Sequence, residues 1–131
     1  MEESICFEIL KEMHKKYQCI VEIERITREI GESLSRNDQM SVQILLGMRQ
    51  DEMDKADLLD KNIRCLISVL PPEEAKQAEN WVKGYEVLNA NGQTPERIIE
   101  KGNNIRQILN RTIEIDKNIS MRIAGTHSFY N

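Results

Sequence analysis

The sequence has few of the residues that build a fixed active site. Of its 131 residues only 5% are aromatic, two are histidines and three are cysteines. Cys6, Cys19 and Cys65 form no Cys-x-x-Cys pair, and three widely spaced cysteines do not describe a disulfide framework. We therefore expect reduced thiols that act as small apolar residues.

Motifs for metal, phosphate and nucleophile chemistry are missing as well. Helical bundles that hold two iron ions carry Glu-x-x-His pairs, and zinc proteases carry His-Glu-x-x-His, but the sequence has neither. It also has no Gly-x-Ser-x-Gly elbow and no glycine-rich phosphate loop. We expect no metal ion, no cofactor and no catalytic residue, and so no enzyme.

Charge and hydropathy disfavour nucleic acid and membrane partners. The net charge is −4, and the basic residues form no stripe that could neutralise phosphates. No apolar run approaches the length of a membrane span, so we expect no stable membrane insertion. The acidic start of the chain does not resemble a signal or transit peptide, and we expect a cytoplasmic protein.

What the sequence does contain is helical periodicity. Residues 2–35 repeat apolar residues every three or four positions, which predicts one long amphipathic helix. Such a helix would be about 50 Å long and could not fold without a partner along its length. Its apolar stripe consists of Ile5, Ile9, Met13, Tyr17, Ile20, Ile23, Ile26, Ile30 and Leu34.

Three further helices follow from stripes and breaks. We predict them at residues 38–70, 73–89 and 95–124, with a flexible tail over residues 125–131. The fold class is all-α: one domain, residues 1–131, forming an antiparallel bundle of two long helices, a short third helix and a long C-terminal helix. The second stripe comprises Leu45, Met48, Ala56, Leu59, Ile63, Leu66 and Leu70, and the third patch comprises Trp81, Val82, Tyr85 and Leu88.

Capping residues support these boundaries. Asn37 or Asp38 can cap the second helix, and Pro72 suits the first turn of the third. Thr94-Pro95-Glu96 is a good helix start, and Gly125 is expected to end the last helix. Because Gly102 and the Asn91-Gly92 break flank its start, we expect the last helix to be mobile before it binds a partner.

His14 allows one catalytic hypothesis. A lone exposed histidine on a bundle is how histidine phosphotransfer domains work, and those domains resemble this chain in size and class. Their motif places a lysine and a glycine just downstream of the histidine, whereas here Lys15, Lys16, Tyr17 and Gln18 follow, with no glycine. A solvated surface histidine is the simpler interpretation.

The broad stripe of the last helix is the main candidate for partner binding. Ile99, Leu109 and Ile113 make it wider than one helix–helix seam needs. It either wraps a three-sided core or leaves an apolar face for a partner's amphipathic helix, with the aromatic residues near the C-terminus as added anchors. The candidate residues are Ile98, Ile105, Ile108, Leu109, Thr112, Ile115, Ile119, Ile123, Phe129 and Tyr130.

Three segments of the chain are similar to those of a known protein family. They are the hairpin turn Leu34-Ser35-Arg36-Asn37-Asp38, the helix that follows over residues 40–63, and the last helix over residues 102–125 with its paired asparagines. These segments resemble flagellar type III export chaperones of the FlgN-like class. One departure is the middle of the chain, where Pro71-Pro72 and the Trp81 helix add structure.

This resemblance implies a cytoplasmic chaperone. It would bind the terminal amphipathic helices of hook–filament junction proteins, largely through its C-terminal helix, and present them to an export-gate component. Two other functions stay open: a self-associating adaptor, such as a homodimer that buries the same stripe, and the phosphotransfer domain that would use His14.

Overall fold

The computed structural model describes residues 3–85 and 92–130, with side chains up to residue 122. Four helices make up this part of the chain: α1 (Glu3–Ser35), α2 (Gln39–Ser68), α3 (Pro72–Val82) and α4 (Gln93–Tyr130). The described residues contain no strand. The all-α class, with three long helices and a short third one, is confirmed.

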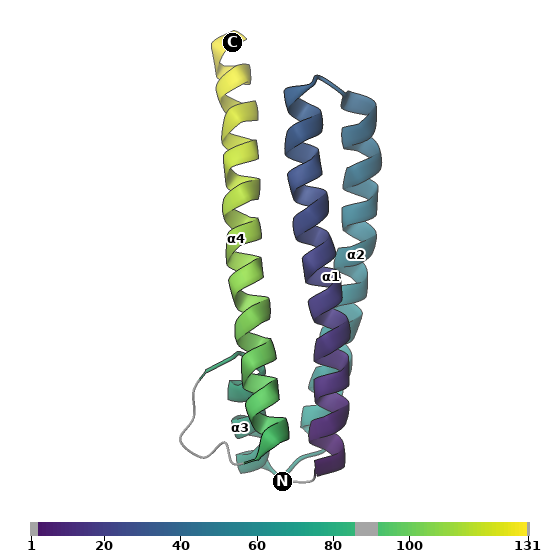
Figure 1. The fold of residues 1–131 in the computed structure, drawn as a ribbon, viewed down its shortest axis with the longest axis vertical. Helices are drawn as coiled ribbons and strands as arrows, with labels where there is room; N and C mark the ends of the chain where they lie inside the picture. Colours follow the sequence, from purple (N-terminus) through teal and green to yellow (C-terminus); the bar gives the residue numbers. More distant parts are fainter. Residues whose placement is uncertain (1–2, 86–91, 131) are drawn as a thin grey trace.

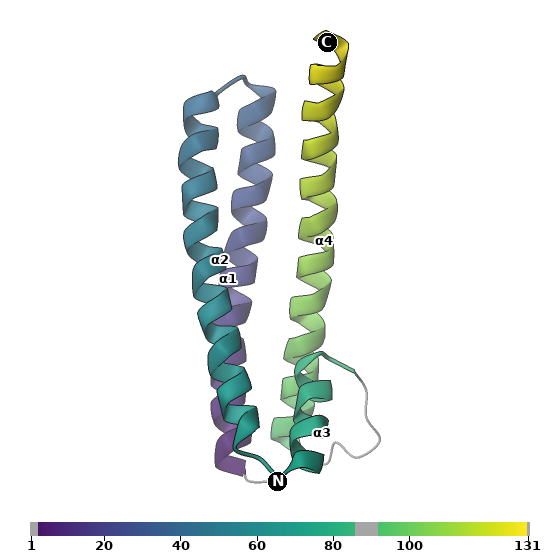
Figure 2. The ribbon, with the colours of Figure 1, turned by 180° about the vertical axis from the view of Figure 1, so that it is seen from behind.

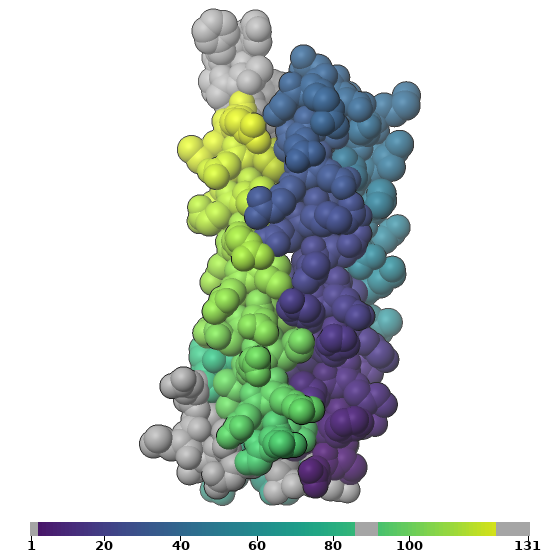
Figure 3. All heavy atoms as spheres, viewed as in Figure 1, coloured from purple at the N-terminus to yellow at the C-terminus, as the bar shows by residue number. Residues whose placement is uncertain are grey.

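The helix α1 occupies the centre of the arrangement. It packs against α2 on one side and α4 on the other, while α2 and α4 make far fewer contacts with each other. Helices α1 and α2 form an antiparallel hairpin, and α4 runs in the same direction as α1 (Figures 1 and 2). Along the face shown in Figure 3, the side chains of α1 and α4 meet over most of the length of α1.

The hairpin turn follows from its sequence. Asn37 adopts a left-handed backbone with φ of 57°, a conformation that asparagine tolerates better than most residues. Asp38 then caps α2, because its Oδ1 accepts a hydrogen bond of 3.1 Å from the amide of Ser41. Of the two predicted caps, Asp38 is the one used.

Helix α3 is shorter than the sequence predicted. Pro72 stands at its first turn as expected, but the helix ends at Val82 rather than at residue 89. Gly84, which was placed inside the helix, instead has φ of 80° and ends it. Tyr85 is exposed rather than part of an apolar patch, and Leu88 lies outside the described residues.

Two glycines fix the end of α3 to α4. A methyl group on Gly102 would collide with the Val82 carbonyl, and one on Gly84 would collide with the backbone of Asn103. The backbones of α3 and α4 therefore touch directly at this point. The absence of a side chain at Gly102 is what allows this close approach.

Helix α4 is longer than predicted. It begins at Gln93, two residues before the expected start, and its backbone remains helical through Gly125 to Tyr130. The predicted stop at Gly125 is therefore wrong, while the flexibility of residues 125–131 stays a prediction. A helical glycine costs only about 1 kcal/mol relative to alanine, and no proline follows to break the helix.

The apolar core divides into two clusters along the bundle. The lower cluster joins all four helices and includes Ile9, Ile63, Trp81 and Ile98. The upper cluster consists of Ile26, Ile30 and Leu45, with Leu34 and Val42 packed against it, so its members come from α1 and α2 only. In this upper part α4 adds little apolar packing to the hairpin.

The predicted stripe of the first helix is confirmed, since each of its nine residues is buried or half-buried. The prediction for α2 needs one correction. Met48 is 41% exposed, while Ile67, which was not predicted, is buried. Helix α2 packs mainly on one neighbour, α1, and such a helix turns fewer positions inward than a fully surrounded one.

Candidate functional site

Most of the predicted binding stripe on α4 lies in the core. Its buried members are Ile98, Ile105, Ile108, Thr112 and Ile119, and its half-buried members are Leu109 and Ile115. The side chains of Ile123, Phe129 and Tyr130 lie outside those that the structure describes. In this conformation the inner part of the stripe is helix packing, in keeping with the first of the two interpretations, and offers no open face.

The open side of the molecule lies elsewhere, between α2 and α4. These helices flank α1 and make few contacts with each other, as two diagonal corners of a four-helix bundle do. At the lower end α3 occupies the remaining corner and contacts both α4 and α2 (Figure 2). Above the end of α3 no other described helix takes this place.

A hydrogen-bonded bridge shows which faces of α2 and α4 look toward each other. Arg49 Nη1 on α2 donates to Asp116 Oδ1 on α4 at 2.9 Å. The same nitrogen donates to Thr27 Oγ1 on α1 at 3.2 Å. Thr27 is fully buried, and its hydroxyl donates in turn to the Ile23 carbonyl at 2.7 Å. The bridge therefore crosses α1 and links all three long helices.

Helical periodicity shows which other residues lie on the same faces of α2 and α4 as Arg49 and Asp116. Residues three or four positions apart share a helix face, so Leu46 and Met53 lie on the Arg49 side of α2. By the same spacing Ile113 lies on the Asp116 side of α4. All three apolar side chains are exposed, at 41%, 37% and 50%. We call the set of Leu46, Arg49, Met53, Leu109, Ile113 and Asp116 the α2–α4 face.

Helix α2 carries a second exposed apolar group on its outer side. Met40, Ile44 and Met48 follow at intervals of four and are 76%, 60% and 41% exposed. Together with Leu46 and Met53, they place exposed apolar side chains on two sides of the first half of α2. Groups of exposed apolar side chains mark interaction surfaces, and methionine is common at adaptable ones. The spacing of Met40, Ile44 and Met48 is visible in the sequence, but only one apolar stripe was predicted for this helix.

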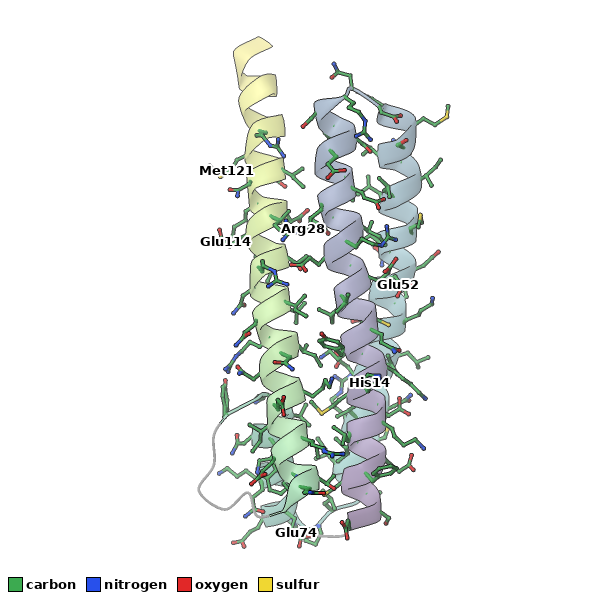
Figure 4. The ribbon with its side chains drawn as sticks, viewed as in Figure 1. His14, Arg28, Glu52, Glu74, Glu114 and Met121 are labelled. Atoms are coloured by element: carbon green, nitrogen blue, oxygen red, sulfur yellow. The ribbon has the colours of Figure 1, made fainter. Side chains whose placement is uncertain are left out.

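Ion pairs tie α4 to α1 on the side away from α3. Arg111 on α4 forms a forked pair with Glu24 on α1, and its Nη2 donates to Oε1 at 2.9 Å. This pairing lowers the pKa of the Glu24 carboxyl, and Arg28 lowers it further. Glu114 and Met121 project away from α1 on the far side of α4 (Figure 4).

His14 lies on the exposed side of α1, beside a cavity of about 490 Å³ between α1 and α4. Its ring stacks against Tyr17 with centroids 6.4 Å apart, and its Nε2 lies 3.4 Å from Gln18 Nε2. Among the described residues no carboxylate hydrogen-bonds to the ring, and the phosphotransfer hypothesis for His14 stays a prediction.

The cysteines differ in environment. Cys6 and Cys19 are buried and Cys65 is exposed, and all three are free thiols. Burial raises the pKa of both buried thiols, and the nearby Glu52 raises the pKa of Cys19 further. The expectation of small apolar residues holds for Cys6 and Cys19, while Cys65 faces solvent.

Within the part of the chain that is described, no three His, Cys, Asp or Glu side chains gather closely enough to hold a metal ion. None of the described helices has the combined length and apolar character needed to cross a lipid bilayer. Comparison with protein-family models, with curated proteins and with solved structures gave no match to this chain. Its function must therefore be argued from its own surfaces.

Proposed function

We propose that the protein binds one amphipathic helix of a partner protein on its α2–α4 face. The observation that carries the proposal is the fourth corner of the bundle, which α3 fills only at the lower end. The partner helix would continue along the same line above α3. It would cover the exposed side chains of Leu46, Met53 and Ile113.

The dimensions of the face set the length of the partner helix. The end of α3 reaches Gly102 and Asn103, and Arg106 still bonds to the Lys83 carbonyl. The uncovered part of α4 with described side chains therefore extends from Leu109 to Arg122, which is roughly 20 Å at 1.5 Å per residue. A partner segment of about four helical turns would match it.

The role that fits such binding is that of a chaperone for a protein with an amphipathic terminal segment. Such segments aggregate or assemble when their apolar side is free, and a helix-binding protein prevents this without a cofactor or a catalytic residue. The resemblance of the hairpin and of the last helix to FlgN-like chaperones makes the finer form of the proposal a cytoplasmic chaperone of flagellar export substrates.

A self-associating module is the second candidate, because the outer side of α2 carries its own apolar stripe, Met40, Ile44 and Met48. A second copy could bury this stripe by packing α2 against α2. The two candidates use different surfaces of the same helix, so substitutions on each surface separate them.

The test is co-purification with matched variants of the full chain. Ile113→Asp with Leu46→Asp alters the α2–α4 face, and Ile44→Asp alters the outer stripe. Phe7→Asp, at a residue 52% exposed near the start of α1, is the control. The partner that co-purifies with the wild-type chain is identified by mass spectrometry and shortened to its binding helix. We expect only the first variant to lose this partner.

The recovery of hook–filament junction proteins would support the flagellar form of the proposal. A partner retained by the first variant would overturn the α2–α4 face as the binding site. A stable dimer that only Ile44→Asp dissociates, with no other partner bound, would favour the self-associating module.

A further inference from the structure

The Arg49 guanidinium lies over Thr27 of α1, in the middle of the α2–α4 face described above. Its side chain is only 16% exposed. It lies between Leu46 and Met53 on its own helix and opposite Asp116 on α4. A helix that docks on this face must pass directly over it.

The hydrogen bonds of Arg49 leave half of its guanidinium unused. Both of its bonds to described residues, to Asp116 and to Thr27, come from Nη1. A guanidinium carries five N–H donors, and its Nε and Nη2 edge forms the fork that matches a carboxylate. Asp116 contacts the opposite end, with a single oxygen on Nη1.

Other charged groups near the face do not complete this fork. Asp60, three turns further along the same side of α2, pairs with Lys16 at 2.7 Å. Lys117, the neighbour of Asp116, pairs weakly with Glu114 at 3.9 Å on the outer surface of α4. Asp116 itself is 47% exposed and holds Arg49 through one bond.

A docked helix would change the energetics of this group. In the free protein water can solvate the unused edge, but a helix lying over it would exclude that water. A charged donor that loses water without gaining a partner costs several kcal/mol. An entirely apolar helix face would therefore be disfavoured, and a lysine or arginine at the same position would add repulsion.

We infer that the partner helix carries one aspartate or glutamate near the middle of its apolar face, and that this carboxylate binds the Nε and Nη2 edge of Arg49. This inference rests on the proposed function, since it assumes that a helix occupies the α2–α4 face. It adds the chemistry by which that helix is selected and a fixed point that sets its register.

The probes are two synthetic amphipathic helical peptides of about 18 residues, long enough for the face with a turn to spare. They share leucine and isoleucine at their other apolar positions and differ only at the central one, which is glutamate in the first peptide and glutamine in the second. Binding to the full chain is measured by calorimetry or by fluorescence anisotropy.

We expect the glutamate peptide to bind at least about tenfold more tightly than the glutamine peptide, because only the carboxylate completes the fork. Arg49→Gln should remove this preference. Arg49→Lys, which keeps the charge but not the planar fork, should remove most of it. Asp116→Asn keeps Arg49 in place and should preserve or increase it.

Three outcomes would count against the inference in different ways. Equal binding of the two peptides would overturn the carboxylate contact and leave helix binding intact. An undiminished preference in Arg49→Lys would overturn the fork. If neither peptide binds, and Ile113→Asp has no effect on the natural partner, the α2–α4 face itself is wrong. Circular dichroism of each variant separates loss of binding from loss of folding.

Discussion

Gly102 on α4 and the carbonyl of Val82 at the end of α3 lie so close that no side chain fits between them. This contact holds α3 against α4. It fixes the position at which α3 stops covering the open corner of the bundle. The length of the α2–α4 face therefore depends on this contact and on the one between Gly84 and Asn103.

We expect Gly102→Ala to destabilise the protein by about 1–3 kcal/mol, because the added methyl group forces the two helices apart. Gly47→Ala is the matched control, since a methyl group at Gly47 meets no atom within 4 Å. That substitution should raise stability by up to about 1 kcal/mol through helix propensity. Thermal and urea unfolding of both variants measure these effects. A Gly102→Ala protein as stable as the wild type would contradict the close contact.

Acid should weaken the attachment of α4 to α1 through Glu24. Arg111 lowers the pKa of this carboxyl in the folded state, so the pair stabilises the fold above the ordinary glutamate pKa of about 4.3. The stabilisation is lost as the pH falls below that value and through the lowered folded pKa. Urea unfolding at a series of pH values should show a smaller acid-induced loss of stability in Glu24→Gln than in the wild type. Glu114→Gln, on the outer surface of α4, should behave as the wild type does.

Thiol labelling should distinguish one fast-reacting cysteine from two slow-reacting ones. Cys65 is exposed, whereas Cys6 and Cys19 are buried and their thiol pKa values are raised, so few thiolates form there. Dithionitrobenzoate should react quickly with one thiol per chain in the native protein and with three in denaturant. Cys65→Ser should remove the fast phase, and a second fast thiol in that variant would show that a buried site opens readily.

Two isoleucines of α4 should respond in opposite ways to the same substitution. Ile108 is 9% exposed and belongs to the lower core cluster, so Ile108→Asp should unfold the protein or lower its stability by several kcal/mol. Ile113 is 50% exposed, and Ile113→Asp should leave folding intact while it removes partner binding. Circular dichroism spectra and thermal melts check both. A folded Ile108→Asp variant would mean that the stripe is less buried than described.

The long helices could be predicted from periodicity because each one buries an apolar stripe: α2 and α4 bury theirs against α1, and α1 buries its own against both. The residues of the α1 stripe are buried or half-buried as expected, since this helix is surrounded on two sides. The prediction for Met48 is wrong because α2 packs mainly on α1, and the periodicity of a stripe does not show how wide the contact with the neighbouring helix is.

The candidate site was less accessible from the sequence. The α4 stripe was found, but whether it faced the core or a partner depended on how the helices are arranged in space. The role of Arg49 could not be predicted from the sequence, because a single arginine on a helix is ordinary until its partners on α1 and α4 are known. The end of α3 was misplaced because the left-handed backbone at Gly84 arises from its contact with α4.

The upper core cluster draws its side chains from α1 and α2 alone. Among the described side chains, the α4 residues above Leu109 attach outside this cluster, through the buried Thr112 and Ile119, the half-buried Ile115, and the Arg111 and Asp116 ion pairs. Such a segment should open as a separate cooperative unit, so its amides should exchange with deuterium while those of the hairpin remain protected. One wall of the proposed binding face would then be adjustable, and a partner's affinity would include the free energy of ordering that wall.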